Sequence, residues 1–449
     1  MHRYFMLVLV YITTSALAAC SQQSAPSPEQ QPPEPAPQEP EPEPQASPPE
    51  PAASEPAPTK APPLDVDPNL TTSINALGVD LYGRLRSRPG NLSIAPMSIS
   101  LALAMTYAGA RSETAAQMAK VLHFDMDADA LNGAAERLLK SVSAGGGSGG
   151  ELKIANRLFG EKSYTFEAPF LALTKERYGA ELESVDFRGA PEQSRAKING
   201  WVSERTERHI EEILPAESID EDTRLVLVNA MFFKGRWTHP FPAKATSPGT
   251  FHTSATASAE IPMMHLTEEL RYVQRDGVHV LEMPYADHDL AMTILLPEAA
   301  NGLDALEASL TPERIGELRA SLTSQRVAVT MPRFTVAPSE PISLKTTLID
   351  LGMPLAFNPS RADFTGMANP PNEGDKLYIG NVFHRTFVEV NEEGTEAAAA
   401  TAVQMQVRGI AAPPVELVAD HPFLFLIHTR GTGAILFIGR VSDPSAPSS

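Results

Sequence analysis

Apolar residues recur along this chain in patterns that predict both helices and buried strands. The segment 69–86 has one apolar face at helical spacing, formed by Ile74, Leu77, Leu81 and Leu85. The segment 96–110 begins at a proline and is apolar on nearly every side, and a helix of that kind belongs in the centre of a large domain. The continuous apolar run 225–233 is typical of a buried strand.

The other patterned segments continue this mixture of helices and strands. An amphipathic helix is predicted over 198–214, before Pro215. Further strands are predicted over 280–285, 291–297, 327–334 and 421–427. No second Pro/Gly-rich linker divides residues 67–443, so we expect one large domain there, followed by a flexible tail at 444–449.

The segment 387–408 carries the most unusual pattern. Residues 387–390 alternate like a strand, and the polar turn N-E-E-G at 391–394 ends in a glycine, which adopts backbone angles that other residues resist. Beyond the turn, one face consists of Thr395, Ala397, Ala399, Thr401, Val403, Met405 and Val407. The other consists of Glu396, Ala398, Ala400, Ala402, Gln404, Gln406 and Arg408. This is the pattern of a half-buried strand, and no proline interrupts it from 388 to 412.

An alanine-rich exposed helix is the alternative for this segment, because alanine is the best helix former. The prolines at 413 and 414 and the hydrophobic segment 421–427 favour the strand. About twenty small and polar residues between two core strands are too many for a passive connection, and long loops of this kind usually carry function.

The first residues form an export signal. His2 and Arg3 precede the apolar run 5–12 and then Leu17-Ala18-Ala19-Cys20. Residues 1–19 therefore fit a signal peptide, and the apolar run is too short for a membrane span. The tetrapeptide resembles the bacterial lipobox, which implies cleavage before Cys20 and lipidation of its thiol. An ordinary signal peptide cut after Ala18 or Ala19 is the alternative. We favour lipidation because Cys20 is the only cysteine, and several acyl chains on one residue anchor stably.

Residues 20–66 form a stalk rich in Pro, Glu, Gln, Ala and Ser. Such a segment cannot bury enough apolar surface to order itself, and its prolines favour an extended chain of about 140 Å at most. Because Ser21 follows the cysteine, the lipobox resemblance implies the outer membrane, on its periplasmic side or at the cell surface. Release to the extracellular space is the other location that fits an exported protein.

Composition excludes several classes of function. A net charge of −19 argues against nucleic acid or an anionic membrane surface as a partner, so contact with membrane is expected only through the N-terminal lipid. The eleven histidines are scattered, and no metal-ligand spacing, P-loop or dinucleotide fingerprint is present, so no metal or cofactor is expected. The run G-G-G-S-G-G at 145–150 contains G-x-S-x-G. We interpret it as a flexible loop, since a helix is predicted before it and a strand after it, the reverse of the hydrolase order.

The motifs at the C-terminal end identify a family resemblance. V-E-V-N-E-E-G-T-E-A-A-A-A-T-A, followed by D-H-P-F-L-F-L-I and I-L-F-I-G-R-V, resembles the hinge, reactive-centre loop and last strands of an inhibitory serpin. The resemblance runs through the whole of 67–443. It implies an α+β fold with a large, mostly antiparallel central sheet, two smaller sheets, eight or nine helices and an exposed reactive-centre loop. It implies a monomeric inhibitor rather than an enzyme, which traps a protease as a covalent acyl complex when the cut loop enters the sheet as a new strand.

The same resemblance assigns roles to particular residues. The hinge of the loop comprises Glu393, Gly394, Thr395, Glu396, Ala397, Ala398, Ala399, Ala400 and Thr401. Ser98, Asn229 and His384 match residues that hold two strands of the large sheet together, and Trp237 matches a plug at the top of that gap. The family usually has a second serine where this chain has Ala95, so one polar contact there is expected to differ. From the residues alone, His384 is a core histidine with a satisfied hydrogen bond.

The resemblance also places the bond that the protease attacks. The family's scissile residue lies fourteen positions after the hinge glycine, which gives cleavage between Arg408 and Gly409. An arginine fits a protease pocket with a carboxylate at its base, so trypsin-like serine proteases or arginine-specific cysteine proteases are the expected targets. The stretch 409–422 is a few residues longer than usual, so registers toward Met405–Val407 or Ile410 stay open. A non-inhibitory carrier, chaperone or storage serpin, or a purely adhesive lipoprotein, are the alternative functions.

Overall fold

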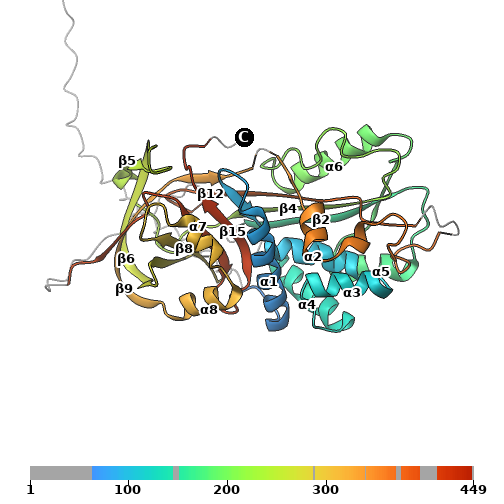
Figure 1. Cartoon of the computed structure of the whole chain (residues 1–449), viewed down its shortest axis with the longest axis horizontal. Helices are drawn as coiled ribbons and strands as arrows, with labels where there is room; N and C mark the ends of the chain where they lie inside the picture. The colour runs from blue at the N-terminus through green and yellow to red at the C-terminus, as the bar shows by residue number, and fades with distance from the viewer. Residues whose placement is uncertain are drawn as a thin grey trace, which may run out of the picture. The chain divides into compact units, whose positions relative to one another are not determined.

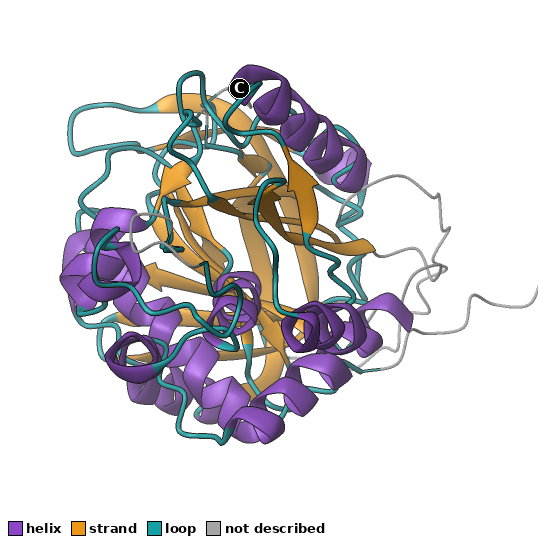
Figure 2. Ribbon diagram, turned by 90° about the vertical axis from the view of Figure 1, so that its right-hand side faces the viewer, coloured by secondary structure: helices purple, strands orange, loops and turns teal. Residues whose placement is uncertain are grey.

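A computed structural model describes residues 63–144, 151–286, 289–338, 340–370, 376–394 and 412–446. These residues all belong to one compact unit, 56–449. Within the described ranges the helices are α1 Pro68–Leu85, α2 Pro96–Tyr107, α3 Ser112–Val121, α4 Ala128–Ala144, α5 Ala168–Tyr178, α6 Pro191–Arg205, α7 Leu303–Ala308, α8 Pro312–Ala320 and α9 Lys345–Leu351. The fold is α+β, as expected, and Figure 2 shows the strands in the centre with helices around them.

The described strands form two hydrogen-bonded sheets. They are β1 Leu92–Ile94, β2 Glu151–Glu161, β3 Glu183–Val185, β4 Leu225–Lys234, β5 Ser247–Phe251, β6 Ala259–Arg275, β7 Val278–Pro284, β8 Leu290–Pro297, β9 Thr323–Pro332, β10 Phe334–Val336, β11 Ile342–Ser343, β12 Val382–Val390, β13 Val415–Val418, β14 Phe423–Thr429 and β15 Ile435–Val441. One sheet has the order β10-β12-β4-β2-β3, with β11 also on β12. The other has the order β1-β15-β14-β8-β7-β6-β9-β13, with β5 also on β6. The two smaller sheets of the expected fold are joined into this one nine-stranded sheet. The long strand β6 connects them, because it pairs with β7 at its end and with β9 and β5 over the rest.

Two helices enclose the six-stranded sheet from opposite sides (Figure 1). The helix α2, predicted to be central because it is apolar all round, is buried throughout 96–106 and contacts β2 and β4. The helix α6 covers the opposite face of the same strands. Alternate residues of β4 and β12 therefore point into two separate cores.

Two predicted elements differ from the structure. The strand expected over 327–334 is β9, which runs from Thr323 to Pro332, and Phe334 begins β10. The amphipathic helix was expected over 198–214, but α6 begins at Pro191, whose fixed φ suits a first helical position, and ends at Arg205. Glu207 and Arg208 adopt positive φ angles of 51° and 66°, which a helix cannot contain. The apolar residues Ile210, Ile213 and Leu214 are buried as expected, but from an irregular segment.

Candidate functional site

The six-stranded sheet contains a parallel seam between β12 and β4. The two strands pair from Val382 beside Leu227 to Val388 beside Phe233. In the middle of the seam His384 lies directly beside Asn229, and both side chains are fully buried. His384 Nδ1 hydrogen-bonds to Asn229 Oδ1. The residue types predicted to hold two strands together therefore meet across the seam.

Two further side chains, the buried Ser98 and the partly buried Asn156, extend this pair into a polar cluster. Asn229 Nδ2 donates to Ser98 Oγ on α2 at 2.7 Å and to Asn156 Oδ1 on β2 at 2.6 Å. Asn156 returns a hydrogen bond from its Nδ2 to the Ser98 carbonyl at 3.0 Å. The cluster therefore joins α2, β2, β4 and β12. The sequence analysis missed Asn156, because only the strand order places it beside Asn229.

At Ala95, where the family usually has a serine, the contact with the polar cluster comes from the backbone. The Ala95 N–H donates to His384 Nε2 at 3.0 Å, so Nε2 is the acceptor and Nδ1 carries the proton that reaches Asn229. The imidazole is neutral in this arrangement. Burial lowers the pKa of His384 from its usual value near 6.5 to about 3, which agrees with that state.

The hinge begins at the upper end of the seam. Asn391 and Gly394 form a tight antiparallel bridge immediately after β12. Gly394 has φ of +110°, and a Cβ there would lie 2.0 Å from the Gly235 carbonyl oxygen and 2.6 Å from the Arg236 Cα. The position therefore requires glycine both for its backbone angle and for its close approach to the end of β4.

Trp237 fixes this turn to the end of β4. Its backbone N–H donates to the Glu393 carbonyl at 3.0 Å, and its indole Nε1–H donates to the Asn391 carbonyl at 3.0 Å. The indole stacks on Tyr285 with ring centroids 4.3 Å apart, and its exposed fraction is 3%. The structure thus places the predicted plug residue against the turn that follows β12.

Glu392 is a buried carboxylate that the sequence analysis did not select. Its Oε1 accepts hydrogen bonds from Thr246 Oγ1 and from Arg333 Nε, the latter at 2.7 Å. Burial by itself would raise the pKa of Glu392, but these hydrogen bonds hold it below its ordinary value. The carboxylate therefore ties the turn to the residue between β9 and β10 and to the segment before β5. The sequence shows that Glu392 lies inside the turn, but it does not show its partners, which are more than fifty residues away.

The outer face of the seam is covered by the irregular segment that follows α6. His209 stacks on Phe232 of β4 at 4.4 Å and lies 4.6 Å from Phe387 of β12. Arg385 donates to the Glu212 carbonyl. Any strand that enters the seam must displace these contacts.

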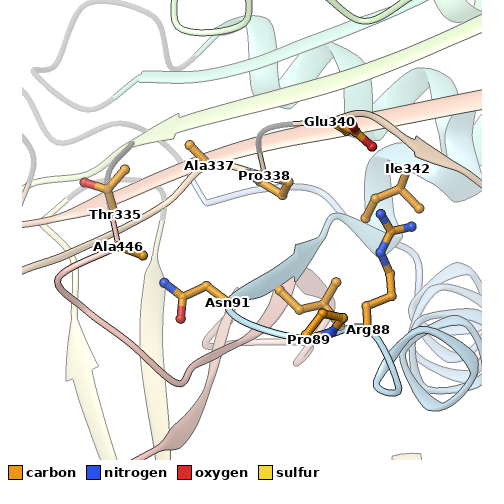
Figure 3. A pocket seen from close by; sticks show the side chains of 10 residues that line it. Arg88, Pro89, Asn91, Thr335, Ala337, Pro338, Glu340, Ile342 and Ala446 are labelled. Carbon is orange, nitrogen blue, oxygen red and sulfur yellow. The ribbon is translucent and has the colours of Figure 1, made fainter. Parts of the chain in front are cut away.

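Cavities lie near both edges of β12. One of about 200 Å³ lies where β4 and β12 begin, at the end of the seam opposite Gly394. A larger one of about 360 Å³ lies at the other edge of β12, beside β10 and β11, and Figure 3 shows its rim with Arg88, Asn91 and Glu340. Since β10 and β11 pair with the edge of β12 that faces away from β4, the larger cavity is not part of the seam.

The remaining predicted site residues lie outside the described residues. They are Thr395, Glu396, Ala397, Ala398, Ala399, Ala400 and Thr401 of the hinge, Arg408 and Gly409 of the scissile bond, and Cys20. The loop at 145–150 is also outside them, and α4 precedes it while β2 follows it. Across the described part of the chain, no group of His, Cys, Asp and Glu is arranged to hold a metal, and no helix is long and apolar enough to cross a membrane.

Comparison with known proteins defines the class. The family model for Serpin (serine protease inhibitor) matches residues 72–444. The chain is 43% identical over 385 residues to a leukocyte elastase inhibitor of Sus scrofa, covering 84% of this chain and 99% of the relative. It is 39% identical over 401 residues to Serpin B10 of Bos taurus, with 84% and 99% covered. The chain belongs to the serpin family.

Solved structures agree with this assignment. The crystal structure of a thermophilic serpin, Tengpin, in the native state matches with a TM-score of 0.76 at 27% identity, covering 86% of this chain and 97% of that one. Uncleaved ovalbumin matches with a TM-score of 0.74 at 29% identity, with 84% and 100% covered. The fold class expected from the sequence is confirmed. The printed description of the family, serine protease inhibitor, names inhibitors and not enzymes.

Proposed function

We propose that this serpin is a suicide substrate that traps a trypsin-like protease by inserting its cleaved loop into the β4–β12 seam. The observation that carries the proposal is the parallel seam itself, with the loop leaving from its upper end. A chain that turns back after β12 runs antiparallel to both β12 and β4. Insertion would therefore exchange one parallel ladder for two antiparallel ladders, which are slightly more stable per residue.

The turn at 391–394 supports a specific register for insertion. Extending the Asn391–Gly394 bridge residue by residue would bring Thr395 opposite Val390 and Ala397 opposite Val388. Val388 and Val390 are buried in the main core, and directly opposed residues share a face. The small and apolar face that begins at Thr395 would thus enter the core, and the face with Glu396 would point outward. This agreement between a backbone bridge and a sequence pattern is independent of the family resemblance.

The same register brings Thr401 opposite His384. Insertion separates Asn229 from His384, so both would lose their mutual hydrogen bond in a fully buried place. A threonine hydroxyl both donates and accepts, so Thr401 would bridge the two residues it separates. The threonine at this position therefore lowers the cost of opening the cluster, because a buried unsatisfied polar group costs about 1–3 kcal/mol.

Insertion would also supply the energy of inhibition. About fourteen residues at ~3.3 Å each form a strand of about 45 Å. If each new ladder hydrogen bond contributes ~0.5–1.5 kcal/mol, insertion releases on the order of 10 kcal/mol. The uncut form is then secured kinetically, and cleavage at Arg408–Gly409 removes the restraint while the protease is still held as an acyl-enzyme.

We also propose that the protein is displayed on the cell envelope. Lipidated Cys20 would anchor it, and residues 20–66 would act as the stalk except at its end, where Leu64 and Val66 are buried in the main core. Residues 67–443 would be the inhibitory domain, with a short tail at 444–449. The support for this is the lipobox and the composition of the stalk.

A non-inhibitory carrier is the second candidate. The observation that favours it is the likeness to a thyroxine-binding globulin complexed with its ligand, with a TM-score of 0.75 at 26% identity. Incubation with trypsin followed by a denaturing gel distinguishes the two. Inhibition predicts a band at the summed mass of serpin and protease that withstands denaturation, and a carrier yields only a cut product.

A further inference from the structure

The cavity at the lower end of the seam is rich in hydrogen-bond donors. It is bounded by the first residues of β4, by the chain leading into β12 and by the first residue of α9. Its polar lining includes Ser218, Arg224, Lys345, Tyr378 and Asn381. Its volume of about 200 Å³ is sufficient for a small polyatomic ion with some water, since one water occupies about 30 Å³ in the liquid.

Several of these donors have no protein partner within the described residues. The Lys345 ammonium and the Tyr378 hydroxyl make no hydrogen bond or ion pair with described residues, and the Ser218 hydroxyl is buried without one. Asp220 is the one acid among the lining residues, and its carboxylate is bound within its own loop. Asp220 Oδ1 accepts from the Asp222 N–H and from the Thr223 hydroxyl. The lining thus combines two cations, Arg224 and Lys345, with one carboxylate, Asp220, and the Ser218 and Tyr378 hydroxyls have no partner among the described residues.

We propose that this cavity is a binding site for a small oxyanion of the phosphate type, and that the bound anion regulates the outcome of protease attack. An ammonium and hydroxyl groups supply the charge and the donors that phosphate oxygens accept, and hydrogen bonds to charged groups are stronger than those between neutral groups. Arg224, which donates to the Glu221 and Thr223 carbonyls and has its Nη2 3.9 Å from Asp222 Oδ1, adds a second cation to the lining.

The regulatory half of this inference rests on the proposed function. With the register described above, Gln404 would lie opposite Asn381 and Met405 opposite Gly380, both of which line the cavity. The last residues of the inserting strand and a bound anion would therefore need the same space. An occupied cavity slows the end of insertion, so the acyl-enzyme hydrolyses more often and the serpin is consumed as a substrate.

Calorimetric titration of inorganic phosphate into the full-length, uncut protein tests the site without any protease. At constant ionic strength we expect saturable one-to-one binding that Lys345→Met weakens at least tenfold. Arg88→Met, which removes a cation from the larger cavity at the far edge of β12, is the matched control and keeps wild-type affinity. Tyr378→Phe provides a second variant, with a several-fold loss. No binding to the wild type, or equal binding to Lys345→Met, overturns the site.

The regulatory half is measured by the ratio of trapped to cut serpin after reaction with trypsin. Saturating phosphate should lower the trapped fraction several-fold in the wild type and leave Lys345→Met unchanged. An unchanged ratio in the wild type overturns the regulation. If no covalent complex forms even without phosphate, the proposed function fails instead, and the calorimetric result still decides the binding site.

Discussion

His384 and Asn229 lie side by side on two parallel strands and share a hydrogen bond from the imidazole Nδ1–H to the amide Oδ1. The pair is fully buried in the middle of the seam that the proposed mechanism must open. The imidazole is also bound at Nε2 by the Ala95 N–H, so each polar atom has a partner while the seam is closed. A polar pair at this place holds the strands in register, and a new strand with a matching polar group can replace it.

We expect the stability of the protein to depend on pH through His384. Its pKa is about 3 in the folded protein, below the unfolded value near 6.5, so the unfolded state binds more protons between these limits. The contribution of His384 to stability is therefore fully present above about pH 6.5 and is lost as the pH drops toward 3. In chemical unfolding between pH 6 and pH 4, His384→Gln should show a slope shallower than that of the wild type by about 1.4 kcal/mol per pH unit.

His252→Gln, at an exposed histidine, is the control for this measurement and should keep the wild-type slope. His428 is also buried with a pKa of about 3, so part of the acid sensitivity remains in His384→Gln. An unchanged slope in His384→Gln contradicts a neutral histidine in the seam.

Gly394→Ala should destabilise the uncut protein by about 1–3 kcal/mol, because a Cβ meets the Gly235 carbonyl and the φ angle is positive. Gly200→Ala, in the interior of α6 with nothing within 4 Å of the added Cβ, should stabilise it by ~0.5–1 kcal/mol. Thermal unfolding of both variants measures whether the first is destabilised and the second is stabilised. Equal behaviour would show that the hinge does not press against the end of β4.

Thr395→Arg should convert the inhibitor into a substrate. In the proposed register this side chain enters the core beside Val390, and a guanidinium without a partner is costly to bury. We expect normal folding and normal cleavage by trypsin, with at least a tenfold loss of covalent complex on a denaturing gel. Thr256→Arg, in an exposed turn, is the control and should inhibit normally. A full yield of complex from Thr395→Arg would falsify the insertion mechanism.

The bond attacked should lie between Arg408 and Gly409. Mass spectrometry of the fragment released after reaction with trypsin should find a new N-terminus at Gly409. Arg408→Ala should slow complex formation with trypsin by orders of magnitude, because the base of the trypsin pocket binds a guanidinium. A new N-terminus at Gln406 or Ala411 would instead support one of the other registers and would remove the argument for arginine-specific targets.

Cys20→Ser should move the protein from the membrane fraction to the soluble fraction of the producing cells, because the thiol is the proposed site of the lipid. Ser24→Ala, four residues further along the stalk, should remain with the membrane. Partition of both variants with detergent would place the anchor elsewhere in the chain.

Local patterns were sufficient for much of the fold. The apolar helix α2 and the buried strand β4 follow directly from runs of apolar residues, since burial on all sides leaves no polar face. The boundary of α6 could not be predicted in this way, because residues 206–214 keep an apolar pattern while the backbone leaves the helix at Glu207. A hydrophobic pattern reports which residues are buried, and not the backbone angles through which they reach the core.

The sequence by itself determined the family, the two faces of the segment after Gly394 and the residue types of the polar pair, because these depend on neighbouring residues and on a specific order of motifs. Only the tertiary structure decided that Asn156 joins Asn229, that the Ala95 N–H binds His384 and that Glu392 meets Arg333. It also placed a cavity at the lower end of the seam. These contacts join residues 59 to 289 positions apart. Strand order and register decide which of these distant residues meet, and both are properties of the whole packed sheet rather than of any one segment.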